Sequence, residues 1–382
     1  MQLDLTEVQR LLQESAQRFL SERYDLLIRK RIADTEQRFS PEIWQAFAQM
    51  GWLGLPLSQE DGGFGGGPRE VGLLMEAFGK ALVLEPYLSS VLLGGSLIAA
   101  SGTASQRVRW LKPLVEGRLR IALAHGESMF ESLPGAIATR AQACEGGWIL
   151  DGDKPMVLDA PVADSVLVSA RLGDPKGSGQ SRLALFMVPV NAQGLALQRF
   201  DTLDGRLAGK LQLRQVRVAQ TDRLGEGECL QGVVDRVLDA AIAALCAEAV
   251  GCMQYLLDAT VAYTRTRVQF DRPLSANQVL RHRMVDMAIQ VEEGRAMALR
   301  AAFNVQASPA LRTREVSGAK LKISRAARFV AENAIQLHGA MGVTEELAVG
   351  AYARRLLAFE KTLGTVAEHE RRLADAVLRR AA

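Results

Sequence analysis

The stretch QGVVDRVLDAAIAALCAEAVGCMQYLLDATVAYTRTR (residues 231–267) decides the fold, because it continues without a proline far beyond the length of an ordinary helix. Apolar and small residues cover most of any helical surface that it could form, which predicts a long helix buried among others. Further helices are expected at 276–306, at 309–338 and, as a pair, within 345–381. Residues 223–382 are therefore predicted to form a C-terminal four-helix bundle.

The two parts that precede this bundle differ in texture. Residues 119–222 hold short β-branched or alternating runs, such as DSVLVSARL and KLQLRQVRV, separated by Gly, Pro, Asp and Asn, and this pattern predicts a β-domain. The loop DPKGSGQS at 174–181 is expected to join two of its strands. Residues 1–118 are predicted to be helical, with Thr6 and Ser40 as N-caps. The predicted fold class is α+β.

The charge balance argues against nucleic acid as a partner. The 382 residues include 46 Lys and Arg against 43 Asp and Glu, a formal net charge of +3. The basic residues are scattered and mostly stand at helical spacing beside acids, which is typical of solvated helix faces rather than of a binding stripe. No nucleic-acid partner is therefore expected.

The cysteines and the apolar runs bear on location and metals. The four cysteines are spread widely along the chain: Cys144, Cys229, Cys246 and Cys252. They form no CxxC or Cys/His cluster, so no metal site is expected, and Cys246 and Cys252 are interpreted as buried free thiols suited to a reducing cytosol. Asp239 and Glu248 interrupt the longest apolar runs, and no signal-like apolar block is seen at the N-terminus. A cytoplasmic protein without a membrane span is predicted.

Three stretches carry a family resemblance that covers the full length. TRTRVQFDRPLSANQ (264–278) resembles the R-x-x-F-G-x-x-[ILV]-x-x-x-Q signature of acyl-CoA dehydrogenases. QLHGAMGVTEE (336–346) is similar to the Q-[LI]-H/F-G-G-x-G turn of that family, and LDGDKPMVLDA (150–160) resembles its G-x-K-x-W-I-[ST] segment. Within the family, the chain looks most similar to the small subunits of heterotetrameric enzymes for pimeloyl-CoA-like or steroid side-chain substrates.

The resemblance implies an FAD-dependent oxidoreductase of lipid or fatty acid catabolism. It would desaturate an acyl-CoA thioester, pass electrons to an electron-transfer flavoprotein or a similar acceptor, and assemble as a homo- or heterotetramer. Family positions that reach the FAD of a neighbouring subunit fall on Arg267, Phe270, Gln278, Gln336 and Gly339. An arginine between long helices can form charge-assisted hydrogen bonds to a diphosphate, and a phenylalanine can pack on adenine or ribose. The alternative for both motifs is an ordinary helix-connecting turn with a C-cap glycine.

Two neighbouring positions are added to this cofactor set. His338 stands between Gln336 and Gly339, and it is interpreted either as a member of the flavin site or as a structural histidine without an acid–base role. Thr365 falls on the threonine of the family's flavin-side E-G-T step, so the resemblance implies a flavin contact there as well.

The family reaction requires a carboxylate base, which the aligned positions lack. A carboxylate removes the proton α to the thioester carbonyl, and the β-hydrogen leaves as hydride to the flavin. The usual base position aligns on Leu363, and a less common one aligns on Ala241. The arginine that usually follows the latter to contact substrate is Ile242, so Asp239 is the remaining candidate for substrate contact in that patch.

Two other acids are candidates for the missing base. Glu248 stands among apolar residues in AALCAEAVGCM, where an unpaired carboxylate would hold its proton tightly, as a base must. Its structural alternative is a buried ion pair with an arginine of another helix, such as Arg295 or Arg325. Glu360, three residues before Leu363, is a second candidate, or else a surface acid beside a lysine.

The β-domain also departs from the family pattern. The flavin-contacting T-E-P-x-A-G-S-D segment corresponds to AHGESMFESLPG (124–135), and the expected Trp and hydroxyl residues are Met156 and Leu158. The half-site for the subunit's own flavin is thus eroded, whereas the half offered to a neighbour is intact. Three functions stay open: an atypical dehydrogenase that uses Glu248 or another carboxylate, a non-catalytic subunit that completes a partner's FAD site, and a flavin oxidase or monooxygenase on the same scaffold.

Overall fold

The computed structural model describes residues 4–128, 137–172, 182–225 and 230–378. The predicted loop at 174–181, residues 129–135 of the AHGESMFESLPG segment and Cys229 lie outside the described residues. Contacts divide the chain into two units. The first joins Met1–Arg31, Pro68–Val83 and Ile242–Ala382, and the second joins Ile32–Gly67 and Leu84–Ala241. The domain limits at 118 and 222 stay predictions.

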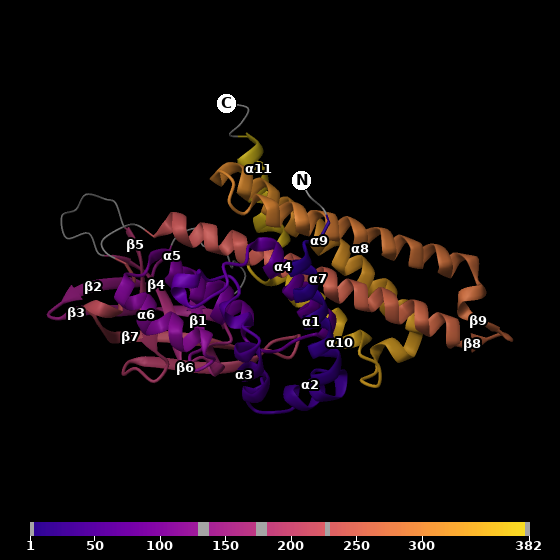
Figure 1. Ribbon diagram of the computed structural model, residues 1–382, viewed down its shortest axis with the longest axis horizontal. Helices are drawn as coiled ribbons and strands as arrows, with labels where there is room; N and C mark the ends of the chain where they lie inside the picture. The colour runs from indigo at the N-terminus through magenta and orange to yellow at the C-terminus, as the bar shows by residue number, and fades with distance from the viewer. Residues whose placement is uncertain (1–3, 129–136, 173–181, 226–229, 379–382) are drawn as a thin grey trace. The chain divides into compact units, whose positions relative to one another are not determined.

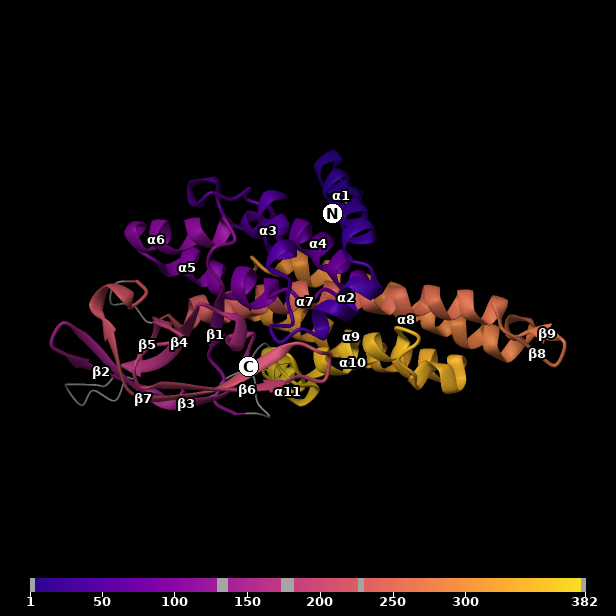
Figure 2. The ribbon, with the colours of Figure 1, turned by 90° about the horizontal axis from the view of Figure 1, so that it is seen from below.

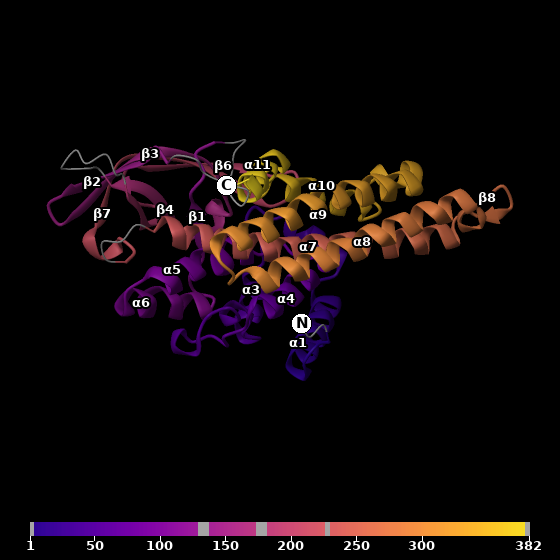
Figure 3. The same cartoon turned by 90° about the horizontal axis from the view of Figure 1, so that it is seen from above.

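The first unit contains the predicted C-terminal bundle. Its helices are α7 (Gln231–Thr266), which begins in the second unit, α8 (Gln278–Asn304), α9 (Pro309–His338), α10 (Val349–Lys361) and α11 (Val366–Leu378). Helix α8 runs alongside α9, and α10 and α11 also pack on α9 (Figure 3). The four stretches predicted from apolar spacing are confirmed as helices.

Two N-terminal helices complete the first unit, namely α1 (Glu7–Arg23) and α4 (Pro68–Ala81). Thr6 caps α1 as predicted, because its side chain accepts a hydrogen bond from the backbone of Gln9. Helix α4 contacts α7 backbone to backbone. A Cβ added at Gly79 would lie 1.9 Å from the carbonyl oxygen of Glu248, and one added at Gly251 would lie 2.0 Å from that of Glu76. Only glycine permits this approach.

A tight hairpin joins α7 to α8. Strands β8 (Val268–Gln269) and β9 (Arg272–Pro273) pair antiparallel at the end of these two helices (Figure 2). The two residues between them, Phe270 and Asp271, both have positive φ, 55° and 61°, as a two-residue type I′ turn requires. Left-handed backbone is uncommon for a bulky side chain, so the conformation of Phe270 is strained.

The second unit contains a seven-stranded mixed sheet, whose strands are labelled in Figures 1 and 2. Its strands are β1 (Ile121–Ala124), β2 (Arg140–Cys144), β3 (Gly147–Leu158), β4 (Ser165–Leu172), β5 (Arg182–Pro189), β6 (Leu195–Asp201) and β7 (Leu207–Ala219). The order is β1-β4-β2-β3-β7-β6, with β5 on β4. Alternating apolar side chains bury a core on the sheet, which confirms the β-domain predicted from period-two runs.

Helices of the second unit are short. They are α3 (Pro41–Gln49), α5 (Ser96–Ser101) and α6 (Ala104–Val115), while α2 (Leu26–Ala33) spans the border between units. Ser40 caps α3 as predicted, because its hydroxyl accepts from the backbone of Ile43 at 3.2 Å. The helical N-terminal part, the central sheet and the C-terminal bundle confirm the predicted α+β class.

Helix α7 bears on the question of membranes. By length and composition it could cross a bilayer, and 78% of its most apolar window is buried inside the structure, as in the core helix of a soluble protein. The prediction that no apolar segment is long enough to span a membrane is not confirmed. Although the helix contains Asp239 and Glu248, the mean hydropathy of its most apolar window stays high enough for a membrane span.

Candidate functional site

A cavity of about 500 Å³ lies in the first unit, where α7 ends, α8 begins and α9 ends. It brings together four of the predicted cofactor residues, Arg267, Gln336, His338 and Gly339. The remaining lining residues are Tyr263, Leu274, Val279, Leu280, Arg283, Leu337, Ala340 and Met341. Two motifs about seventy residues apart in the sequence, R-x-x-F and QLHGAMG, thus contribute to one site.

Local backbone structure positions the two motifs. Arg267 follows directly on α7, and its backbone N–H still donates to the carbonyl of Tyr263 at 2.8 Å. Gly339 ends α9 with φ 60° and ψ −139°, a conformation that residues with a Cβ rarely adopt. No atom lies within 4 Å of the Cβ that a substitution would add there, so the backbone angle rather than crowding demands glycine.

The positive charges in this cavity have no counter-charge among the described residues. The guanidinium groups of Arg267 and Arg283 form no hydrogen bond or ion pair with any residue that the structure describes. His338 is different, because its Nδ1 lies 2.8 Å from the carbonyl oxygen of Ala334 and its ring stacks on Tyr263 with centroids 4.4 Å apart. A site with two unpaired guanidinium groups suits an anionic ligand.

The surroundings of His338 fix its protonation. A carbonyl can only accept, so Nδ1 carries the hydrogen toward Ala334, and Nε2 is left as an acceptor. Burial lowers the pKa of His338 and outweighs the opposite effect of that hydrogen bond, so the ring is neutral near pH 7. The positive charge of the cavity therefore comes from its arginines.

Three predicted cofactor residues do not line this cavity. Phe270 projects from the hairpin turn with 94% of its surface exposed. Gln278 is the first residue of α8 and is absent from the lining. Thr365 caps α11, because its Oγ1 accepts from the backbone N–H of Glu368 at 3.3 Å while its own N–H donates to the Glu368 carboxylate at 2.7 Å. A flavin contact for each of the three stays a prediction.

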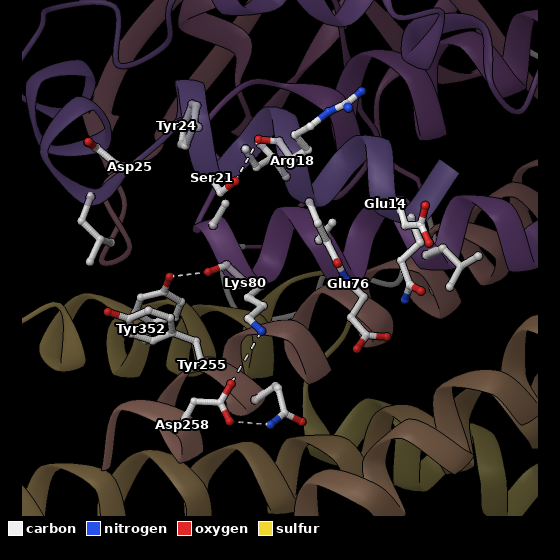
Figure 4. A pocket seen from close by; sticks show the side chains of 18 of the residues that line it. Glu14, Arg18, Ser21, Tyr24, Asp25, Glu76, Lys80, Tyr255, Asp258 and Tyr352 are labelled. Carbon is white, nitrogen blue, oxygen red and sulfur yellow. Dashed lines mark hydrogen bonds and ion pairs between the residues drawn. The ribbon is translucent and has the colours of Figure 1, made fainter. Parts of the chain in front are cut away.

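A larger cavity of about 820 Å³ lies elsewhere in the first unit (Figure 4). Four of its charged lining residues pair with one another, whereas Glu14, Arg18 and Asp25 line it as well. Lys80 lies 3.6 Å from Asp258, which also accepts from Gln254 at 2.9 Å, and Arg295 pairs with Glu76. We place the candidate site in the smaller cavity, because both motifs line it and because the guanidinium groups of Arg267 and Arg283 have no partner among the described residues.

Glu248 is buried, as predicted, but it is not alone. Its Oε1 lies 2.5 Å from Nη1 of Arg355 on α10, and both side chains are under 10% exposed. Arg355 also donates to the carbonyl of Val83 at 2.9 Å. A buried ion pair was predicted as the structural alternative, and it is present. Its two suggested partners were wrong, because Arg295 pairs with Glu76 and Arg325 pairs with Glu370. This geometry favours the structural role.

The other two acids give no clearer base. Glu360 is paired with Arg328 at 2.8 Å, and although burial opposes the effect, this hydrogen bond keeps the pKa of Glu360 below its usual value. Such an acid is a weak proton acceptor. Asp239 is fully buried in the early part of α7. A substrate contact for Asp239 stays a prediction.

The segment that holds Leu363 is fixed by two buried side chains. Leu363 itself has left-handed backbone, with φ 54°. Lys320 Nζ on α9 donates to the carbonyl of Thr362 at 3.0 Å and to that of Phe359, and burial lowers the pKa of Lys320 to about 7. His369 Nε2 lies 3.0 Å from the carbonyl oxygen of Leu363. The family's base position is thus ordered but carries a leucine.

Two buried histidines make the fold sensitive to acid. Burial lowers the pKa of both His125 and His369 to about 3, with smaller contributions from nearby cations. Between pH 6.5 and pH 3 the unfolded chain binds a proton at each site that the native chain does not, so stability falls as the pH falls. We expect each histidine to remove about 1.4 kcal/mol of unfolding free energy per pH unit across this window.

The measurement is urea unfolding from pH 7.5 down to pH 5 for the wild type and His369→Gln. Glutamine does not titrate, so the variant should lose one histidine's share of the slope. His282, which is exposed on α8, supplies the matched control His282→Gln, which should keep the wild-type slope. Parallel curves for the wild type and His369→Gln would contradict the assignment.

In the second unit, the lysine of the G-x-K motif is fully buried. Lys154 Nζ donates to the carbonyl of His125 at 3.0 Å, to Oε1 of Glu127 at 2.8 Å and to Oγ of Ser169 at 3.1 Å. Burial lowers the pKa of Lys154 to about 8, although Glu127 opposes the effect. Met156, at the expected tryptophan position, is 38% exposed. The lysine of this motif therefore keeps a structural role while its tryptophan is lost.

Three residues of these sites escaped the sequence analysis: Arg283, Arg355 and Lys320. Arg283 stands four residues after Val279 and three after Leu280, so helical spacing could have placed it on their face. Nothing in the sequence singles out Arg355 or Lys320 among the many basic residues of α9 and α10. Of the described residues, no group of His, Cys, Asp and Glu could hold a metal ion.

A helical N-terminal part, a central sheet and a C-terminal helical bundle are the architecture of the acyl-CoA dehydrogenase fold, and the cavity with two arginines lies in that bundle. Family models of the acyl-CoA dehydrogenase N-terminal domain and C-terminal domain match residues 6–118 and 232–378. The chain therefore belongs to the acyl-CoA dehydrogenase family, whose members are FAD-dependent oxidoreductases acting on the CH–CH bond of acyl-CoA.

Named relatives support this assignment. The chain is 31% identical to acyl-CoA dehydrogenase FadE12 of Mycobacterium tuberculosis over 321 residues, 81% of either chain. It is 28% identical to the probable acyl-CoA dehydrogenase YngJ of Bacillus subtilis, over 91% of this chain and 92% of that one. Among solved structures, the ChsE4-ChsE5 complex from Mycobacterium tuberculosis matches with a TM-score of 0.88 and 26% identity, over 99% of both chains.

Proposed function

We propose that this chain serves in the FAD-dependent α,β-desaturation of an acyl-CoA thioester as a subunit that supplies half of a flavin site but not the catalytic base. The cavity with Arg267, Gln336 and Gly339 carries this proposal, because its arginines have no partner within the described chain. Leu363 supports the second half, because a leucine cannot remove a proton where the family has a carboxylate.

Each residue of the half-site has a physical role in the proposal. The Arg267 guanidinium would bind the diphosphate, and Gln336 would donate or accept with its amide. The exposed Phe270 would pack against the adenosine end of a ligand held by a neighbouring subunit. FAD, when bound, accepts the hydride from the β-carbon, while the partner subunit supplies the carboxylate that removes the α-proton.

The proposal extends to partners and location. The solved relative ChsE4-ChsE5 is named as a complex of two chains, which supports a hetero-oligomer with a second acyl-CoA dehydrogenase subunit. An electron-transfer flavoprotein or a similar protein would take up the electrons. Cys246 and Cys252 are buried free thiols, and the pKa of Cys246 is raised to about 12 by burial, which suits a reducing cytoplasm.

The alternative is a chain that catalyses by itself with Glu248 as an unusual base. Glu248 is as deeply buried as a base of this kind should be, but Arg355 neutralises it at 2.5 Å. A carboxylate that a buried guanidinium of another helix holds in an ion pair fits a structural role better than that of a base presented to a substrate. We therefore rank the subunit function first.

The test is the absorption spectrum of the purified chain, alone and co-expressed with a homologous dehydrogenase subunit from its own genome. We expect a colourless chain alone, and flavin absorbance that bleaches on addition of acyl-CoA when both chains are present. The partner expressed without this chain is the control, and it should retain little flavin. A yellow single chain that reduces an artificial acceptor with acyl-CoA would refute the subunit function.

A further inference from the structure

The cavity of Arg267 contains a second unpaired arginine that the family motif does not include. Arg283 lies on α8 and lines the same 500 Å³ space, together with Val279 and Leu280. Like that of Arg267, its guanidinium group forms no hydrogen bond or ion pair with any residue in the part of the chain that the structure describes. Two positive charges that line one concave site create a positive local potential, which attracts an anion.

Helical phase explains why Arg283 rather than Gln278 belongs to this cavity. Residues three and four apart share a helix face, so Arg283 lies on the face of Val279 and Leu280, which also line the cavity. Gln278 lies five residues before Arg283, which turns it about 140° away around the helix axis. The motif glutamine and the cavity arginine therefore point in different directions from α8.

The number and type of charges indicate the class of ligand. His338 is neutral and contributes an acceptor nitrogen, so the cavity holds two positive charges from its arginines. A guanidinium matches a phosphate group with two parallel hydrogen bonds, and two guanidinium groups match two linked phosphates better than one. The apolar remainder, including Leu280 and Met341, suits the organic part of a nucleotide.

We infer that Arg283 is a second anion-binding residue of this cavity and that it shares, with Arg267, the two phosphate groups of a nucleoside diphosphate moiety. This inference rests on the proposed function, because such a moiety is part of FAD. Coenzyme A carries the same moiety with an additional 3′-phosphate, so the two sources share their chemistry at this site.

Calorimetric titration of the full chain with ADP and AMP tests the inference. The Arg283→Gln variant loses one charge-assisted contact. We expect its affinity for ADP to be about 10- to 100-fold lower than that of the wild type, and its affinity for AMP to fall by much less. Arg281→Gln is the matched control, because Arg281 stands two residues away on α8 and lines a different groove. That variant should bind ADP within about twofold of the wild type. Thermal midpoints of all variants verify folding.

Two further titrations separate the ligand sources. FAD and adenosine 3′,5′-bisphosphate, the nucleotide end of coenzyme A, are compared with ADP on the wild type, with the partner subunit present where the chain alone binds neither. Tighter binding of FAD assigns the cavity to the flavin, and tighter binding of the bisphosphate assigns it to coenzyme A. Binding of none of these nucleotides, with or without the partner, would refute an anion site.

The outcomes distinguish this inference from the proposed function. If acyl-CoA bleaches the flavin of the two-chain enzyme while Arg283→Gln binds ADP and FAD like the wild type, the inference fails and the function stands. If ADP binding depends on Arg283 but no acyl-CoA bleaches a flavin, the function fails and the inference stands. Equal losses for ADP and AMP would overturn the sharing of two phosphates.

Discussion

Replacing Glu248 with glutamine is expected to lower the free energy of unfolding by about 3–5 kcal/mol. The carboxylate of Glu248 lies 2.5 Å from the Arg355 guanidinium, and both side chains are almost fully buried. The substitution keeps the shape of the side chain but removes the carboxylate charge that lies against the buried Arg355 guanidinium. Breaking one member of such a pair costs far more than the pair contributes as a whole.

Urea unfolding followed by circular dichroism measures this loss. The matched control is Glu360→Gln, which removes a carboxylate from an ion pair with the more exposed Arg328 and should cost about 1 kcal/mol or less. A double variant, Glu248→Gln with Arg355→Met, should recover part of the stability because neither charge of the pair remains. Full stability of Glu248→Gln, together with lost turnover, would reverse the ranking and make Glu248 the base.

Replacing Arg267 with glutamine is expected to weaken flavin retention by the two-chain enzyme about 10- to 150-fold. The guanidinium of Arg267 has no partner in the described chain, so its removal leaves no internal charge uncompensated and should not weaken the fold. A charge-assisted hydrogen bond to phosphate contributes about 1.5–3 kcal/mol, which corresponds to that change in affinity.

Dialysis of the co-purified complex against flavin-free buffer, followed by its absorption spectrum, measures retention. Arg265→Gln is the matched control, because Arg265 stands two residues before Arg267 and lines a separate groove between α7 and α8. That variant should keep its flavin. If Arg267→Gln stays yellow while its fold is intact, the half-site does not reach a phosphate, and the proposed function loses its main support.

The elements were predictable because their signals are local. The helix at 231–266 follows from a run of apolar and small residues without a proline, and the sheet follows from period-two alternation. Glu248 could be predicted as buried for the same reason. Its partner could not, since Arg355 lies 107 residues away and many other arginines have equal claims until the helices are packed.

The candidate site shows the same division between local and tertiary information. The two motifs pointed to Arg267, Gln336, His338 and Gly339, which line one cavity, while their contact with a flavin stays a prediction. A linear motif gives the order of residues but not the rotation of a helix about its axis. The motif therefore could not show that Arg283, rather than Gln278, lines the cavity. Leu363 could be aligned with the missing base, but its ordered backbone depends on Lys320 and His369, which contact it only in the folded chain.

The backbone contact between α4 and α7 has a consequence for biosynthesis. Gly79 and Gly251 belong to one packed unit, yet the second unit is largely encoded between them. On the ribosome, α4 emerges long before α7 exists, so its buried residues, such as Leu74 and Phe78, wait without their partner surface. Recombinant chains that stop before residue 242 should therefore expose this face of α4 and aggregate. During synthesis, chaperones should bind the nascent chain until α7 has been translated.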